Sequence, residues 1–129
     1  MEALFADVNW LAVGVSPIIS FILSGLWYSP KMFGTKWAKG VGVNVVADAK
    51  QPMPALVTQF IGTLLFAWVV ALAYTNGSIA SIVLISITFF FLLVAANLFA
   101  EHSVYATVVE GMLIITMGLI MVVCNIFLQ

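Results

Sequence analysis

Four long runs without charge constrain the fold of this chain more than any other feature. The first, NWLAVGVSPIISFILSGLWYSP, extends from Asn9 to Pro30 and contains no Asp, Glu, Lys or Arg. A helix rises 1.5 Å per residue and the hydrocarbon core of a bilayer is about 30 Å thick, so roughly 20 apolar residues cross it. The runs predict four membrane-spanning helices in a single helical domain of 129 residues, over about 9–28, 54–74, 79–99 and 107–128.

The composition excludes a water-soluble fold. Only 7% of the residues are charged and 64% are hydrophobic, whereas about 25% of the residues in a typical soluble domain are charged. A net charge of −1 with four basic residues gives no surface for nucleic acid. One His and one Cys are too few for a structural zinc site, and no motif of an enzyme or a cofactor site is present. The lipid bilayer is the expected surrounding.

The lysines predict how the helices cross the membrane. All four lie between the first two spans, in the loop 29–53, at positions Lys31, Lys36, Lys39 and Lys50. Positively charged loops stay in the cytoplasm, so we expect this loop inside and both termini outside the inner (cytoplasmic) membrane. The first span lacks the basic flank of a signal peptide and is predicted to be retained. The fold class is thus an all-α, N-out/C-out bundle of four transmembrane helices, with interfacial aromatic anchors at Trp10, Trp27, Tyr28 and Trp37.

Small residues recur at helical spacing in the first and last spans. Ser16, Ser20 and Ser24 follow each other at intervals of four around Pro17, and Gly111 and Gly118 are seven apart, so each set shares a helix face. Such stripes are typical of close helix packing in membranes. A polar lining for a path or a site is the alternative for the serines, and packing is the favoured interpretation.

Glu110 is the only carboxylate inside a predicted span. An ionisable group there is costly and indicates a functional site. We therefore predict a polar pocket in the cytoplasmic half of the bundle, where Glu110 contacts Gln59 or Asn97. Thr58 and Ser24 are further candidates for this pocket, and Glu101 with His102 just outside the span is a candidate interfacial switch. In the alternative interpretation, Glu110 stabilises the first turn of its helix through the macrodipole and reaches the interface.

The ends of the first span carry a resemblance to a known family. The matching residues are Asn9 to Val13, Gly25 to Pro30, Phe33-Gly34 and Trp37, with a weaker match at Asn97 to Phe99. The chain resembles a bacterial family of small four-span membrane proteins known only as a domain of unknown function. The resemblance implies the fold and a membrane location, and no activity. Members of this family usually have a small polar residue at the start of the last helix where this chain has Glu110, so the resemblance itself implies no shared role for this carboxylate.

Two hypotheses for function follow. In the first, the polar residues of the cytoplasmic half bind an ion, a proton or a small solute, in a non-enzymatic permeation or ligand-binding protein. With few polar residues per chain, a water-filled path requires a homo-oligomer. In the second, the protein is an accessory subunit whose apolar faces dock on a larger membrane complex or bind lipid or pigment.

Overall fold

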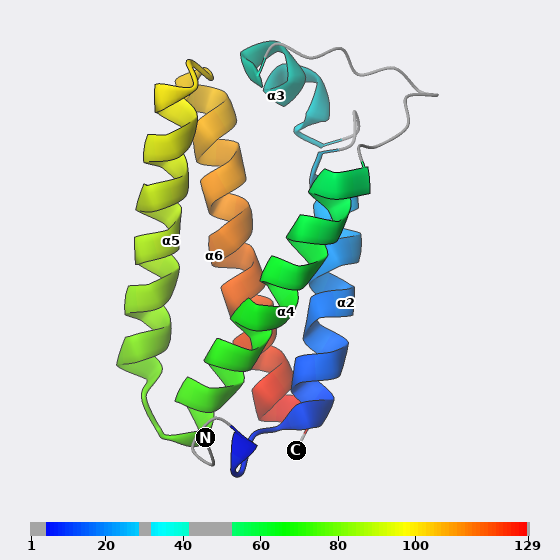
Figure 1. Ribbon diagram of the computed structural model, residues 1–129, viewed down its shortest axis with the longest axis vertical. Helices are drawn as coiled ribbons and strands as arrows, with labels where there is room; N and C mark the ends of the chain where they lie inside the picture. The colour runs from blue at the N-terminus through cyan, green and yellow to red at the C-terminus, as the bar shows by residue number, and fades with distance from the viewer. Residues whose placement is uncertain (1–4, 29–31, 42–52, 129) are drawn as a thin grey trace.

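The computed structural model describes residues 5–28, 32–41 and 53–128 and shows them as an all-helical bundle (Figure 1). Its helices are α2 (Trp10–Trp27), α3 (Gly34–Val41), α4 (Met53–Thr75), α5 (Ile79–Phe99) and α6 (Val104–Phe127). All except α3 are long and apolar enough to cross a membrane. The chain is therefore a multi-pass membrane protein.

Polar side chains fix where the spans begin. The Oδ1 atom of Asn9 accepts from the amide N–H of Ala12 at 3.1 Å, so α2 begins at the next residue. The hydroxyl of Ser103 caps α6 in the same way, which satisfies an otherwise unpaired N–H group. This cap places the start of α6 three residues before the predicted span 107–128. Glu110 is consequently the seventh residue of α6, about 9 Å along the helix axis from its start.

Helix α6 lies at the centre of the bundle, in contact with every other helix named above. The chain turns tightly between α4 and α5, where Gly77 has a left-handed φ of 71° that favours glycine. From this turn, α4 crosses the bundle obliquely and diverges from α5 toward the end that carries α3 (Figure 1). We name this the α3 end and the other, where α2 begins and α6 finishes, the terminal end. Helices α4 and α5 are thus closest at the terminal end and separate toward the α3 end, whereas α5 and α6 stay side by side (Figure 1).

A cluster of buried apolar residues joins α4, α5 and α6. Met121 and Val70 are almost completely buried, and Phe66 and Met117 pack with them. The predicted serine stripe is also buried, since Ser16, Ser20 and Ser24 face inward from α2. The outer surface is apolar, most extensively on α5, as expected for contact with lipid.

Helices α5 and α6 approach very closely along one line, the α5–α6 seam (Ser86, Phe90, Gly111 and Gly118). A Cβ atom added to Gly111 would lie 2.6 Å from the ring of Phe90, and one added to Gly118 would lie 2.9 Å from the hydroxyl of Ser86. Both distances are too short for a normal contact. The seam therefore requires glycine on α6, in the manner of small-residue stripes in membrane helices.

Part of the predicted loop 29–53 forms helix α3, which docks on the start of α6. The amide of Ser103 donates to the carbonyl of Gly40 at 2.9 Å, and a Cβ atom on Gly40 would collide with the Ser103 hydroxyl. The ammonium of Lys36 lies 4.4 Å from the centre of the Tyr105 ring. Residues 29–31 and 42–52, which include Lys31, Lys50 and the Ser29-Pro30 end of the family motif, lie outside the described residues.

Candidate functional site

The carboxylate of Glu110 lies inside the bundle and accepts two hydrogen bonds from other helices. The indole N–H of Trp37, on α3, donates to its Oε1 atom at 2.8 Å. The side-chain amide of Asn97, on α5, donates to its Oε2 atom. Because α6 begins at Val104, Glu110 is not in the first turn of its helix. Its position therefore does not match that of an acid that stabilises a helix start.

Both partners of Glu110 are neutral. Lys36 is directed to Tyr105, and within the described part of the chain no Lys or His side chain forms an ion pair with Glu110. A carboxylate has about four lone-pair positions, and the two N–H donors occupy two of them. Glu110 thus keeps acceptor capacity and an uncompensated negative charge among these residues.

The end of α2 is locked to α3 and α6 by aromatic side chains. The indole of Trp27 donates to the backbone carbonyl of Val109 at 3.0 Å, and its ring lies 4.9 Å from that of Phe33. The neighbouring Tyr28 packs against Trp37 with ring centres 4.6 Å apart. These contacts hold three elements around the turn of α6 that carries Glu110.

Tyr28, the residue after α2, is a neutral polar group beside the carboxylate. Burial raises the pKa of its phenol above the ordinary value, and the negative charge of Glu110 raises this pKa further. The phenol therefore keeps its proton at neutral pH and can donate a hydrogen bond toward the space between the helices.

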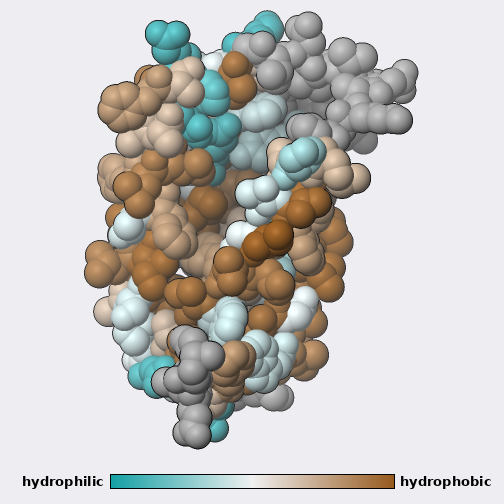
Figure 2. All heavy atoms as spheres, in the orientation of Figure 1, coloured by the Kyte–Doolittle hydropathy of each residue, from teal (hydrophilic) through white to brown (hydrophobic). Residues whose placement is uncertain are grey.

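A cavity of about 320 Å³ begins beside Glu110 and extends into the bundle between α4, α5 and α6. Its volume is at the lower end of the range for small-molecule sites. Figure 2 shows the corresponding hollow on the face between α4 and α5, with hydrophilic side chains gathered above it at the α3 end. Most of the cavity wall is apolar and consists of Phe66, Phe89, Leu93, Leu113, Ile114 and Met117.

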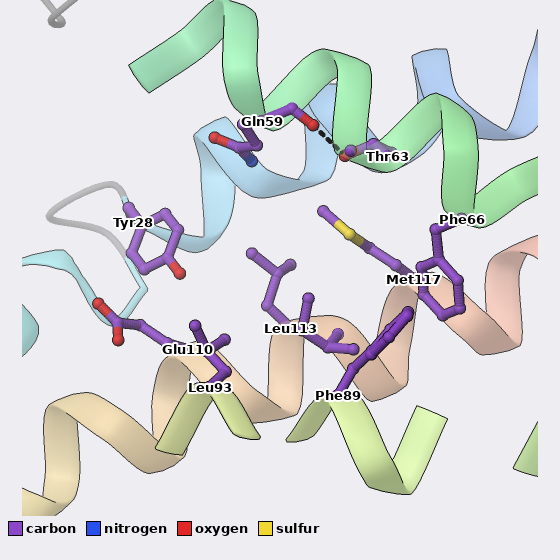
Figure 3. Close-up of a pocket in the computed structure, with 11 residues that line it drawn as sticks. Tyr28, Gln59, Thr63, Phe66, Phe89, Leu93, Glu110, Leu113 and Met117 are labelled. Atoms are coloured by element: carbon purple, nitrogen blue, oxygen red, sulfur yellow. Dashed lines mark hydrogen bonds between the residues drawn. The ribbon is translucent and has the colours of Figure 1, made fainter. Parts of the chain in front are cut away.

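Polar and apolar groups occupy opposite ends of this cavity. Figure 3 shows Glu110, Tyr28 and Gln59 at one end, and Phe66, Phe89 and Met117 at the other. Glu110 and Met117 are seven residues apart on α6, or about 10 Å along its axis. The space therefore has the dimensions and the polarity of a site for a short molecule with one polar end.

The structure brings only some of the predicted pocket residues together. Asn97 contacts Glu110, and Gln59 lines the same cavity on the far side of Tyr28 (Figure 3). Thr58 is exposed and its hydroxyl donates to the carbonyl of Pro54. Ser24 is buried on α2 and donates to the carbonyl of Phe21. Thr58 and Ser24 therefore do not belong to the cavity.

The other predicted pair, Glu101 and His102, lies in the short connection between α5 and α6. Glu101 is exposed with a left-handed φ of 65°, and the backbone N–H of His102 donates to the carbonyl of Asn97 at 3.0 Å. Neither side chain lines the cavity. In the described ranges, no three His, Cys, Asp or Glu side chains lie close enough together to hold a metal ion.

With this geometry established, comparison with known proteins identifies one relationship. A family model with the description "Protein of unknown function (DUF1761)" matches residues 11–127. The chain belongs to the DUF1761 family. The match confirms the resemblance found in the sequence. No curated protein and no solved structure matches the chain.

Three of the residues on which the resemblance in the sequence rests lie around one turn of α6. Trp27 binds the carbonyl of Val109, whereas Trp37 and Asn97 bind the carboxylate of Glu110. From the sequence, Trp27, Tyr28 and Trp37 are predicted only as interfacial anchors, and this role stays a prediction. Their place around Glu110 was not predicted. The sequence gives one indication of this place, because an indole N–H or a phenol hydroxyl in apolar surroundings needs a hydrogen-bond partner.

Trp10, the fourth predicted anchor, lies in a different setting. Its side chain is 47% exposed at the terminal end, and its ring lies near those of Phe5 and Trp68, with centres 6.0 and 5.7 Å away. It has no part in the cavity. The interfacial role therefore fits the surroundings of Trp10 better than those of the other three.

Proposed function

We propose that the protein is a non-enzymatic membrane protein that binds a small amphiphilic molecule in the cavity between α4, α5 and α6. The observation that carries the proposal is the position of Glu110 at the polar end of a mostly apolar cavity. A carboxylate inside a membrane-spanning bundle is costly. The close packing of α5 against α6 does not require it, because glycines and their neighbours, and not Glu110, form the α5–α6 seam. A bound polar group compensates this cost.

The hollow between α4 and α5 supports the proposal that the ligand enters the cavity from the bilayer. These two spans diverge toward the α3 end (Figure 1), and the hollow lies on their shared outer face (Figure 2). Gly62 of α4 lines the cavity, and a Cβ atom added there meets nothing within 4 Å. The space next to Gly62 is therefore open to an alkyl chain.

A path for ions through one chain has less support. Beyond the cavity, Met121 and Val70 are almost completely buried in the core, so the described helices close the bundle toward the terminal end. We therefore propose ligand binding by each chain, with any transfer across the membrane carried out by a homo-oligomer. Native mass spectrometry of the protein in mild detergent measures how many chains the oligomer contains. Co-purification with a different protein at fixed stoichiometry would instead favour the accessory-subunit hypothesis.

The proposed orientation places the α3 end in the cytoplasm and both termini outside the inner membrane. It is supported by the lysines, since all four lie in the loop 29–53 that contains α3, and such loops stay inside. Lys36 and Lys39 are exposed. An impermeant amine reagent should label them in inverted vesicles only, and labelling in right-side-out vesicles would reverse the orientation.

Photolabelling of the protein in lipid nanodiscs tests the binding proposal. The probes are three octyl chains with a diazirine near the chain end and a cationic, a neutral or an anionic head group. We expect at least one probe to label apolar cavity residues such as Leu113 and Met117, and to lose this labelling in Gly62→Leu, which fills the open space. The matched control is Gly14→Leu, at an exposed position on α2 where an added Cβ atom also meets nothing within 4 Å.

The contrary result is equally clear. If none of the three probes labels the cavity above the level found on lipid-facing residues such as Leu84, the cavity is not a binding site. The same conclusion follows if Gly62→Leu and Gly14→Leu lower the labelling equally, since the effect is then not specific to the cavity.

A further inference from the structure

We infer that the ligand of this cavity is an organic cation with one positive charge and an apolar body, such as an alkylammonium ion. The inference rests on the proposed function and adds the chemical class of the ligand. It is carried by the charge balance at Glu110, the shape of the cavity and the aromatic ring of Tyr28 at its polar end.

The charge balance requires a single positive charge. Among the described residues, Glu110 is the only acidic residue of the cavity wall, and no basic group is paired with it. Its two neutral donors, Trp37 and Asn97, leave lone pairs free. A carboxylate removed from water is stabilised when a counter-charge is close, and a cationic head group supplies that charge from the side of the cavity.

The wall of the cavity excludes a bare metal ion as the cation. Hard cations such as Ca²⁺ take six to eight oxygen ligands. Here one carboxylate, the Tyr28 phenol, the Gln59 amide and the Thr63 hydroxyl, which already donates to the carbonyl of Gln59, stand opposite six apolar side chains, too few oxygen ligands for such an ion. The apolar end, around Phe66, Phe89 and Met117 (Figure 3), instead suits a hydrocarbon group attached to the cation.

The aromatic ring of Tyr28 at the polar end also favours an ammonium group. Tyr28 lines the cavity next to Glu110, and its ring lies at a tilt against that of Trp37, which is behind it and does not line the cavity. Cations bind to the faces of such rings, and alkylated ammonium groups are typical ligands of aromatic sites. The carboxylate and the Tyr28 ring together suit a weakly hydrated positive head group.

The test compares the three octyl head groups in wild type and in two matched variants. Binding of octylammonium, octanol and octyl sulfate to the protein in nanodiscs of neutral lipid is measured by the tryptophan fluorescence of the Trp27–Trp37 region, with Trp37→Phe as the assignment control. We expect octylammonium to bind roughly tenfold more tightly than octanol, which corresponds to one partly buried charge pair. Glu110→Gln should remove this preference. Glu101→Gln, which removes an exposed acid from the same end of the bundle, should preserve it.

Each outcome decides the inference. Equal affinity of wild type for octylammonium and octanol, or a preference for octyl sulfate, overturns it, whether or not Glu110→Gln folds. Equal loss of the preference in Glu101→Gln also overturns it, because surface charge then causes the attraction. In these cases Gly62-dependent photolabelling still supports the proposed function. Failure of all probes to label the cavity instead rejects both.

Discussion

Helix α5 meets its two neighbours in opposite ways. Toward α6 it forms the α5–α6 seam, where an added Cβ atom at Gly111 would lie 2.6 Å from Phe90. Toward α4 it borders the cavity, where an added Cβ atom at Gly62 meets nothing within 4 Å. The same residue type thus marks a very tight contact and an open position of the bundle. The difference depends on whether another helix lies opposite the glycine.

This contrast separates glycines at a close helix contact from a glycine that borders the cavity. Lipid tails are as apolar as the side chains of the spans, so membrane helices associate mainly through close packing. The α5–α6 seam has such packing and gives a rigid wall to the cavity. The α4–α5 side lacks it at the α3 end, where the cavity separates the two helices; in the proposed function, a bound molecule takes the place of a helix contact there. Helix α5 is thus closely packed on the side that faces α6 and borders an open space on the side that faces α4.

The largest expected effect separates these two sides by the same substitution. Gly111→Leu places a side chain where the Phe90 ring already lies, and overpacking should lower the free energy of unfolding by about 3 kcal/mol. Gly62→Leu should leave it unchanged or raise it by up to about 1 kcal/mol, since leucine is the better helix former. Unfolding in detergent, followed by circular dichroism, measures both. Equal destabilisation by the two variants would show that α4 and α5 pack together in the membrane.

The second prediction, with a smaller expected effect, concerns how α3 is held against the rest of the bundle. Trp37→Phe keeps an aromatic ring against Tyr28 but removes the N–H donor to Glu110. Hydrogen bonds to charged groups contribute about 1.5–3 kcal/mol, so the docking of α3 should weaken by about 1.5 kcal/mol. Amide hydrogen exchange should rise in residues 34–41 and stay unchanged in α5.

The control for this variant is Trp10→Phe, at the terminal end, which should leave exchange in α3 unchanged. Unchanged exchange of α3 in Trp37→Phe would mean that the Gly40–Ser103 contact holds α3 without the indole. The carboxylate would then be positioned by Asn97 alone.

The spans could be predicted from the sequence because one physical quantity decides them. A run of about 20 uncharged residues has no stable place outside a bilayer, and α2, α4 and α5 lie within two residues of the predicted spans. Helix α6 begins three residues before the predicted span 107–128, because the hydroxyl of Ser103 caps the helix directly before Val104. That small shift places Glu110 in the second turn of α6.

The site was only partly predictable, because it depends on the angles between helices. A polar residue's level in the membrane follows from its position along a span, which is why Glu110, Asn97 and Gln59 were selected. Whether α4 lies against α5 or diverges from it depends on crossing angles that no local pattern encodes. Trp37 was expected in a loop at the membrane surface. Its contact with Glu110 requires α3 to fold back onto α6, which the spacing of the motif does not show.

The smallest expected effect tests whether the serine stripe of α2 belongs to the packed side or to the open side. Ser20 is completely buried, and its hydroxyl has no hydrogen-bond partner among the described residues. An unpaired buried hydroxyl is costly, so Ser20→Ala should raise the free energy of unfolding by about 1 kcal/mol. Ser16→Ala is the matched control, because the Ser16 hydroxyl donates to the carbonyl of Ala12 at 2.7 Å; its loss should leave stability unchanged or slightly lower. Neither change should alter octylammonium binding if the stripe serves packing. Weaker binding in Ser20→Ala alone would instead extend the site from the cavity to α2 and give the unpaired hydroxyl a ligand.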